Sequence, residues 1–91
     1  MSVHSRELLI VNKRGLHASA SAKFVQTVAK FNAEVTVTKD GTTVGGMSIM
    51  GLMMLAASPG CSVEVTAAGP QAAEVLSALE SLVADKFGEE I

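Results

Sequence analysis

The chain has 91 residues, of which 48% are hydrophobic and only three are aromatic, and its formal charge is −2. This length and hydrophobic content indicate a single globular domain over residues 1–91 and exclude a disordered chain. The weak acidity and the absence of Tyr and Trp argue against a nucleic-acid-binding protein, which would use a basic surface and aromatic stacking.

The cysteine content and the hydropathy of the chain further limit the kinds of protein that it can be. Cys61 is the only cysteine, so no internal disulfide can form, and no Cys/His spacing typical of a metal site occurs. We therefore expect no metal and no cofactor. No apolar run approaches the length needed to span a membrane, and none is long enough for a signal peptide. We expect a cytoplasmic protein that does not insert into a membrane.

The first third of the chain predicts one strand and one helix. Residues 1–5 are polar and are expected to form a loose start in which His4 is solvated. The compact apolar run at residues 8–11 is typical of a strand. From Ala18 onward the hydrophobic residues recur at helical spacing, and Asn32 is the expected end of this helix.

The middle of the chain predicts a hairpin. Residues 34–39 alternate between apolar and polar side chains, as in a half-buried strand. Asp40-Gly41 predicts a type I′ turn, whose two central residues both need positive φ, and residues 42–44 would return as the partner strand.

The last part of the chain predicts two helices separated by a strand. Ser48 is a suitable N-cap for a short helix at residues 49–55, and residues 62–66 alternate as a strand. Gly69-Pro70 is expected to open the final helix, and Gly88 to end it. The order β-α-β-β-α-β-α, with one apolar stripe on the helices, predicts a single sheet with helices on one face.

His17 lies where the polar loop at residues 12–15 meets the first helix. The start of a helix presents unpaired N–H groups and the positive end of the helix dipole, which favour an anion and phosphate in particular. Lys13, Arg14 and Lys23 add cations, and no acidic residue is adjacent in the sequence. A histidine with cations but no carboxylate partner suits the acceptance of a phosphoryl group better than hydrolysis. An ordinary exposed or capping histidine is the alternative.

Two short motifs support the first interpretation: Gly15-Leu16-His17 before the first helix, and Ser48-Ile49-Met50-Gly51 at the second. Together with the element order, they resemble the HPr family, the histidine-containing phosphocarriers of the phosphoenolpyruvate-dependent sugar phosphotransferase system. The likeness covers about residues 6–86. It implies an α+β open-faced two-layer sandwich, with a four-stranded antiparallel sheet and three helices on one face.

The resemblance also implies a function. His17 would accept a phosphoryl group from enzyme I and pass it to an enzyme II A-type domain, so the protein would be a carrier rather than a stand-alone enzyme. The alternative is a regulatory binding module, of the nitrogen branch or otherwise HPr-like, that acts through partner docking with little phosphoryl transfer. The sequence does not separate the sugar branch from the nitrogen branch.

One position departs from the family pattern. The family usually has arginine two residues after the histidine, often followed by proline, whereas this chain has Ser19 and Ala20. A guanidinium offers bidentate hydrogen bonds to phosphoryl oxygens that a hydroxyl cannot reproduce. Three interpretations remain open: a slower carrier in which Arg14 or Lys23 supplies the charge, a deliberate substitution that weakens transfer, and a regulator that seldom carries phosphate. We favour reduced but surviving transfer.

The second helix is a candidate docking surface. A helix as short as residues 49–55 can bury only one stripe, so we expect some of its apolar side chains to be exposed. Flexible methionines suit a surface that binds several partners in turn. Our candidates for partner binding are Ile49, Met50 and Met53, with Lys13, Arg14 and Lys23 as surrounding charges. The alternative is that all the apolar side chains of this helix belong to the core.

Ser48 has two expected roles. As an N-cap it would satisfy an unpaired N–H group, which is worth about 1 kcal/mol. By resemblance, it is also a site for an ATP-dependent HPr kinase/phosphorylase. A phosphoserine there would lie favourably at the start of the helix, while its charge beside the apolar side chains would hinder docking.

Overall fold

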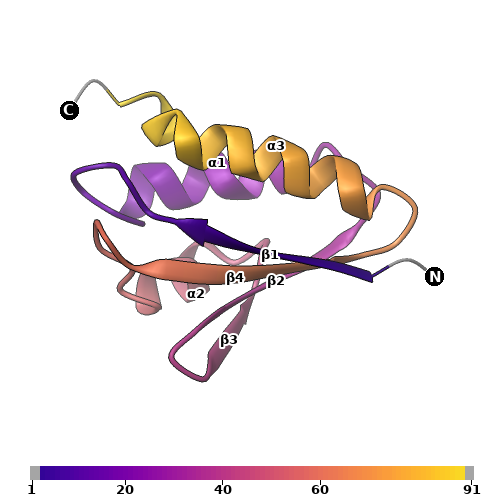
Figure 1. Cartoon of the computed structure of the whole chain (residues 1–91), viewed down its shortest axis with the longest axis horizontal. Helices are drawn as coiled ribbons and strands as arrows, with labels where there is room; N and C mark the ends of the chain where they lie inside the picture. The colour runs from indigo at the N-terminus through magenta and orange to yellow at the C-terminus, as the bar shows by residue number, and fades with distance from the viewer. Residues whose placement is uncertain (1–2, 90–91) are drawn as a thin grey trace.

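The computed structural model describes residues 3–89. Their elements are β1 (Val3–Leu9), α1 (Ala18–Val28), β2 (Glu34–Lys39), β3 (Thr42–Gly45), α2 (Ile49–Met54), β4 (Ser62–Ala68), α3 (Ala72–Ala84) and a short turn at Lys86–Gly88. The strands form one antiparallel sheet in the order β1-β4-β2-β3 (Figure 1). The predicted element order and the predicted four-stranded antiparallel sheet with three helices are confirmed.

One face of the sheet is covered and the other is open. Val35 and Val37 of β2 are buried while their neighbours Glu34 and Thr36 are exposed, which is the alternation of a half-buried strand. In β4 the buried residues are again every second one: Val63, Val65 and Ala67. Helices α1 and α3 lie side by side over this face (Figure 1), and α2 packs against α1 and β3.

The helices bury the apolar stripes that their sequences predict. The buried residues of α1 include Ala20, Phe24 and Val28, and those of α3 include Val75, Leu76, Leu79 and Val83. Leu52 is the buried residue of α2. Phe87, which follows α3 and is 1% exposed, also joins this core. The sequence pattern did not predict that contribution, because Phe87 stands outside the periodic part of the helix.

The Asp40-Gly41 hairpin turn is confirmed. Asp40 has φ 50° and Gly41 has φ 81°, the left-handed values that a type I′ turn requires at both central positions. The turn sets the register of the two strands, in which Lys39 is opposite Thr42.

The first strand lies earlier than predicted. Residues 3–5, expected to be a loose start, are part of β1, and His4 is an exposed strand residue opposite Ala67. Only Leu8 of β1 is buried, because β1 is an edge strand whose side chains mostly face water. An exposed edge strand leaves little hydrophobic pattern in the sequence. Residues 1 and 2 lie outside the described part of the chain.

Three helix boundaries also differ from prediction. Helix α1 ends at Val28, before Asn32, and turns follow it. Helix α3 begins at Ala72, with Gln71 as the residue before it. Pro70 therefore precedes the helix instead of forming its first position. Helix α3 ends at Ala84, and the chain continues into the Lys86–Gly88 turn, because Lys86 and Phe87 take left-handed φ values of 56° that end the helix. Within residues 3–89, no helix is long and apolar enough to cross a membrane.

Candidate functional site

The backbone at His17 is positioned by a tight contact between two loops. Gly15 has φ +65°, and a Cβ atom on it would lie 2.2 Å from the carbonyl oxygen of Ala57. Only glycine fits this position, for both conformational and steric reasons. The next N–H group, that of Leu16, donates a 2.9 Å hydrogen bond to the same Ala57 oxygen. The loop before α1 is therefore fixed to the loop before β4.

His17 is the N-cap residue of α1. Its backbone is extended, with φ −76° and ψ −178°, and its carbonyl accepts a 2.9 Å hydrogen bond from the Ser21 N–H. Its imidazole makes no capping hydrogen bond within the described chain. The ring is thus free for other contacts, and the N–H groups of the first helical turn are not satisfied by this side chain.

The side chain of Asn12 connects the loop before α1 to Glu89. Asn12 is fully buried, and its Nδ2 donates to the Gly15 carbonyl oxygen at 2.8 Å and to Glu89 Oε1 at 3.2 Å. Both contacts are to acceptors, so they determine which end of the amide is the NH2 group. Its Oδ1 has no hydrogen-bond partner among residues 3–89.

Glu89 supplies the carboxylate partner that the sequence did not predict. Its Oε2 lies 2.5 Å from His17 Nε2, and the two side chains are only 15% and 18% exposed. The hydrogen bond with His17 is the main cause that lowers the pKa of Glu89; partial burial acts in the opposite direction, and the Asn12 hydrogen bond adds to the lowering. The expectation that His17 has no acidic partner is therefore wrong. The two residues are 72 positions apart, so spacing could not bring them together.

Phe87 adds two further contacts that hold the C-terminal segment, residues 86–89, in place. Phe87 is buried in the core, and its carbonyl oxygen accepts a 2.6 Å hydrogen bond from Lys23 Nζ. Lys86, Phe87 and Gly88 all have positive φ, at 56°, 56° and 76°. Left-handed backbone at two non-glycine residues costs free energy, and the burial of Phe87 and the Lys23 contact offset that cost.

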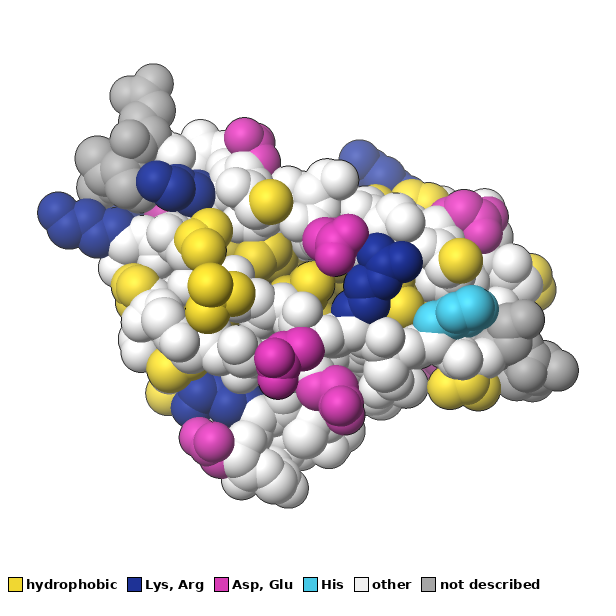
Figure 2. Space-filling model, viewed as in Figure 1, with side chains coloured by type: hydrophobic (Ala, Val, Ile, Leu, Met, Phe, Trp, Pro, Cys, Tyr) yellow, Lys and Arg dark blue, Asp and Glu magenta, His cyan; other side chains and the backbone are white. Residues whose placement is uncertain are grey.

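The three basic residues expected around the docking surface, Lys13, Arg14 and Lys23, differ in their exposure. Lys23 is half-buried and bound to the C-terminal segment, so it is not an open charge at the rim. Arg14 and Lys13 are exposed in the loop before α1, and the charge of Arg14 contributes to the lowered pKa of Glu89. Basic side chains are visible in Figure 2 at the end of the molecule that carries the C-terminus. Ser19 is exposed on the first turn of α1.

Ser48 is the N-cap of α2, as predicted. Its Oγ accepts a 2.9 Å hydrogen bond from the Gly51 N–H. A Cβ atom on Gly51 would lie 3.0 Å from both Ser48 Oγ and Val44 Cβ, which explains why glycine follows three residues after the cap. Ser48 itself is exposed.

The apolar side chains of α2 are largely exposed. Ile49 is 39%, Met50 71% and Met53 41% exposed, so the alternative that all of them belong to the core is wrong. Met47 and Met54 extend the exposed apolar surface, at 58% and 78%. We call Met47, Ile49, Met50, Met53 and Met54 the α2 patch. Its role in partner binding remains a prediction.

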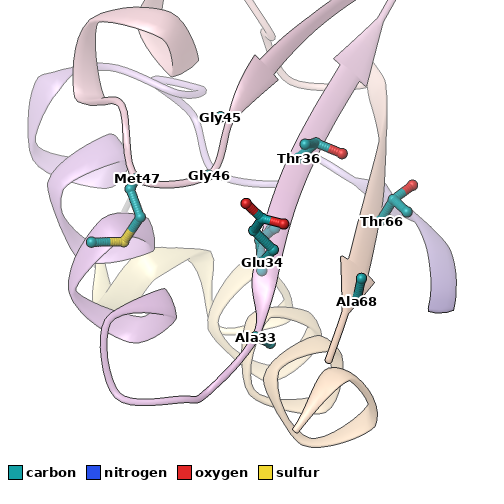
Figure 3. Close-up of a pocket in the computed structure, with 9 residues that line it drawn as sticks. Ala33, Glu34, Thr36, Gly45, Gly46, Met47, Thr66 and Ala68 are labelled. Atoms are coloured by element: carbon teal, nitrogen blue, oxygen red, sulfur yellow. The ribbon is translucent and has the colours of Figure 1, made fainter. Parts of the chain in front are cut away.

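A pocket elsewhere on the molecule contains none of the predicted site residues. It is lined by β2, β4 and the turn at Gly45-Gly46-Met47, with Glu34, Thr36 and Thr66 around it (Figure 3). Apart from the carboxylate of Glu34, its lining is neutral and mostly small. The histidine site is a surface position beside a helix start, which suits contact with another protein more than enclosure of a small molecule.

The structure therefore combines an antiparallel sheet in the order β1-β4-β2-β3, three helices, and a histidine at the start of the first helix. The family described as "PTS HPr component phosphorylation site" matches residues 4–85 of this chain. The chain therefore belongs to the HPr family of the phosphotransferase system.

Individual relatives agree with this assignment. The phosphocarrier protein HPr of Neisseria meningitidis is 52% identical over 80 residues, which cover 88% of this chain and 90% of the relative. The phosphocarrier protein HPr of Cupriavidus necator is 45% identical over 84 residues, covering 92% and 94%. The crystal structure of HPr-C-His from Thermoanaerobacter tengcongensis covers all of both chains, with a TM-score of 0.87 and 44% identity.

Proposed function

We propose that this chain carries a phosphoryl group on His17, which it receives from enzyme I and passes to an enzyme II A-type domain in the cytoplasm. The observation that supports this most strongly is the position of His17. Its imidazole stands at the start of an 11-residue helix without capping it, so a phosphoryl group on the ring would meet the N–H groups of the first turn. Membership of the HPr family supports the choice of donor and acceptor.

The helix start favours the product of the transfer. A phosphoryl group brings negative charge to the positive end of the α1 dipole, which contributes about 0.3–1 kcal/mol per charge at an exposed site. The N–H groups of Ala18, Ser19 and Ala20 belong to this first turn and have no carbonyl partner one turn earlier in the helix. They are suitable donors to phosphoryl oxygens.

Ser19 makes this carrier a weak one. It is exposed on the turn that follows His17, and its hydroxyl replaces the charge and fork geometry of the family arginine. Lys23 is bound to the Phe87 carbonyl, so Arg14 is the cation best placed to compensate. The same substitution favours a second candidate function, a regulatory module that docks partners through the α2 patch and transfers little phosphate.

Ser48 is proposed as a regulatory phosphorylation site for an HPr kinase/phosphorylase. Its exposure and its place beside the α2 patch support this. A phosphate there would add charge next to apolar side chains that we assign to docking, and would therefore act as a brake on transfer.

Labelling by enzyme I tests the main proposal. The protein is incubated with enzyme I and labelled phosphoenolpyruvate, and acid-labile label is measured. We expect label on the wild type and none on His17→Ala. His4→Ala is the matched control, because His4 is the other histidine and lies exposed in β1, whose N-terminal end is at the opposite end of the molecule from the start of α1 (Figure 1). An unlabelled wild type, or equal label on His17→Ala, would overturn the proposal.

A further inference from the structure

We propose that the pocket between β2, β4 and the Gly45-Gly46-Met47 turn binds a small organic cation, a primary ammonium group on a short apolar chain, with Glu34 as its counter-ion. The pocket contains none of the residues of the histidine site and shares only Met47 with the α2 patch. Binding there does not depend on phosphoryl transfer.

The pocket follows from the register of the strands and from small side chains. Directly opposite residues of an antiparallel pair lie on the same face of a sheet, as do residues two apart in one strand. Thr36 lies opposite Thr66 of β4 and Gly45 of β3, and Glu34 lies opposite Ala68. Because Gly45 and Ala68 have little or no side chain, the open face is hollowed at this point. The hollow has a volume of about 390 Å³, within the range of about 300–1,000 Å³ that is usual for small-molecule sites.

The end of β3 forms one wall of the pocket. The N–H of Gly46 donates a 2.7 Å hydrogen bond to the Val35 carbonyl, and a Cβ atom on Gly46 would lie 2.7 Å from Val35 Cγ1. Glycine therefore lets the chain pass close to β2 before it leaves for Met47 and α2. The β2–β3 pairing reaches only to Thr36 and Gly45, so the start of β2 has no neighbouring strand on that side. The cavity occupies the space beside it.

Glu34 supplies the one charge of the pocket lining, which has no Lys, Arg or His. It is exposed, and the ion pairs found among residues 3–89 do not include it. Figure 3 shows its carboxylate between the Gly46-Met47 segment and β4. An ionised carboxylate only accepts hydrogen bonds, whereas an ammonium group has three donors and no acceptor. The charge of the pocket therefore favours a cation.

The rest of the lining suits a hydrocarbon chain. Besides the two threonines and the glycines, it consists of apolar side chains: Ala33, Val35, Met47 and Ala68. Met47 is 58% exposed, and its flexible, polarisable thioether can adapt to a chain that lies against it. A ligand with an ammonium group at one end and an apolar chain at the other matches both parts of the lining.

The surrounding face of the sheet adds to the attraction for cations. Glu7 and Glu64 lie directly opposite each other on this face. The residues of β1, β2 and β4 that share the face with Glu34 include no Lys, Arg or His. Negative charges of one sign raise the local concentration of cations, and the pocket would select those that carry an apolar chain.

The same face favours a free small molecule over a side chain of a partner protein. Around the pocket its hydroxyl groups bond to one another: Ser5 to Thr66 at 3.0 Å, and Thr38 to Thr43 at 2.7 Å. The core of a protein–protein interface is apolar, and such hydroxyl rows offer little apolar surface beyond the pocket itself. We therefore assign the pocket to a free amine.

An NMR titration of the full-length ¹⁵N-labelled protein with n-pentylammonium tests the proposal. At 150 mM salt the Debye length is about 8 Å, which weakens the effect of distant charges. We expect saturable shifts of the amide signals of the pocket, at Glu34, Val35, Gly46 and Met47. The uncharged 1-pentanol has the same chain and should bind about fivefold more weakly, the upper range for an exposed ion pair.

Three variants separate the charge from the cavity. Glu34→Gln should weaken n-pentylammonium binding about fivefold and leave 1-pentanol binding unchanged. Glu64→Gln removes the same charge from the same face outside the pocket and should change the affinity by less than about twofold. Gly45→Ile should abolish binding of both compounds in a folded protein, because its Cβ meets nothing within 4 Å and the side chain shares the pocket face with Thr36.

The outcomes decide each part of the proposal. Absence of saturable shifts at the pocket residues in wild type, or wild-type binding in Gly45→Ile, would overturn the site. Equal affinities for n-pentylammonium and 1-pentanol, or equal losses in Glu34→Gln and Glu64→Gln, would overturn the role of Glu34. If Gly45→Ile does not fold, the comparison of Glu34→Gln with Glu64→Gln decides the question. Tighter binding of Nα-acetyl-lysine amide than of n-pentylammonium would overturn the assignment to a free amine in favour of a lysine side chain of a partner.

Discussion

Lys23 Nζ donates a 2.6 Å hydrogen bond to the carbonyl oxygen of Phe87, and this bond joins the middle of α1 to the C-terminal segment. From the sequence we expect the Lys23 ammonium group to be an exposed charge beside the partner-binding surface. In the structure it binds a backbone carbonyl of the same chain instead. A lysine ammonium group bound to a backbone carbonyl helps to hold the segment at residues 86–89 beside His17.

Lys23→Met should lower stability by about 1.5–3 kcal/mol, the usual worth of a hydrogen bond to a charged group. Urea unfolding followed by circular dichroism measures the change. Lys30→Met removes the same charge from an exposed position just after α1 and should change stability by less than about 0.5 kcal/mol. Equal losses of stability in the two variants would show that the hydrogen bond from Lys23 to the Phe87 carbonyl does not stabilise the fold.

Gly15→Ala should destabilise the protein by about 2–4 kcal/mol, because the new Cβ meets the Ala57 oxygen and φ is +65°. Gly41→Ala separates the two causes, since Gly41 has φ +81° but nothing within 4 Å of its Cβ position. It should lose only about 1–2 kcal/mol. Thermal unfolding compares them. A Gly15→Ala variant no less stable than Gly41→Ala would show that the loops separate easily.

The contact of Glu89 should make stability depend on pH in the acid range. Its pKa in the folded protein is lower than the ordinary value of 4.5, so below that value the unfolded chain binds more protons than the folded one. The stabilisation is complete above pH 4.5 and is lost as pH falls through the lowered pKa. Denaturant unfolding between pH 7 and pH 3 should show a smaller acid loss in Glu89→Gln than in wild type or Glu34→Gln. Parallel curves for all three proteins would count against a stabilising hydrogen bond between Glu89 and His17.

Ser19→Arg should raise the initial rate of labelling by enzyme I about tenfold or more, because it restores a charged donor to the phosphoryl oxygens. Ser19→Lys restores the charge without the planar fork and should give a smaller gain. An unchanged rate in Ser19→Arg would mean that the missing guanidinium does not limit this carrier.

Ser48→Asp should keep the α2 cap, since Asp caps as well as Ser, but place a charge beside the α2 patch. We expect labelling by enzyme I to fall by about tenfold, equivalent to roughly 1.4 kcal/mol of docking free energy. Ser77→Asp, on the exposed side of α3, is the control for charge alone. A wild-type rate in Ser48→Asp argues against a brake at this position.

Local patterns predicted most of the fold. Residues 34–39 and 62–66 alternate visibly, and Asp40-Gly41 specifies its turn through backbone sterics alone. The sequence pattern predicts the first strand too late in the chain, because an edge strand with Leu8 as its one buried residue shows little periodicity. The preference of proline for the first position of a helix predicts Pro70 inside the last helix, whereas Pro70 lies in the turn before Gln71.

The histidine site was predicted only in part. His17 and the Ser48 cap follow from local sequence, since a loop of polar residues before a helix is visible in one stretch. Glu89 does not, because its meeting with His17 depends on the path of the chain after α3 and on the burial of Phe87. The hydrogen bond from Lys23 to the Phe87 carbonyl depends on the same path of the chain after α3. A short Lys-Phe-Gly-Glu run after an amphipathic helix carries no periodic signal that predicts a return to the first helix.

The strand order has a consequence for how the molecule assembles. Strand β1 lies beside β4, and β2 also pairs with β4, so β1 has no partner in the sheet until β4, which follows it by more than 50 residues, is in place. Only the β2–β3 hairpin can form from neighbouring residues. Such non-local pairing slows folding relative to a helical domain of similar size. Since Glu89 follows β4 and α3 in the chain, the contact with His17 should be among the last to close, and its appearance would report the completion of folding.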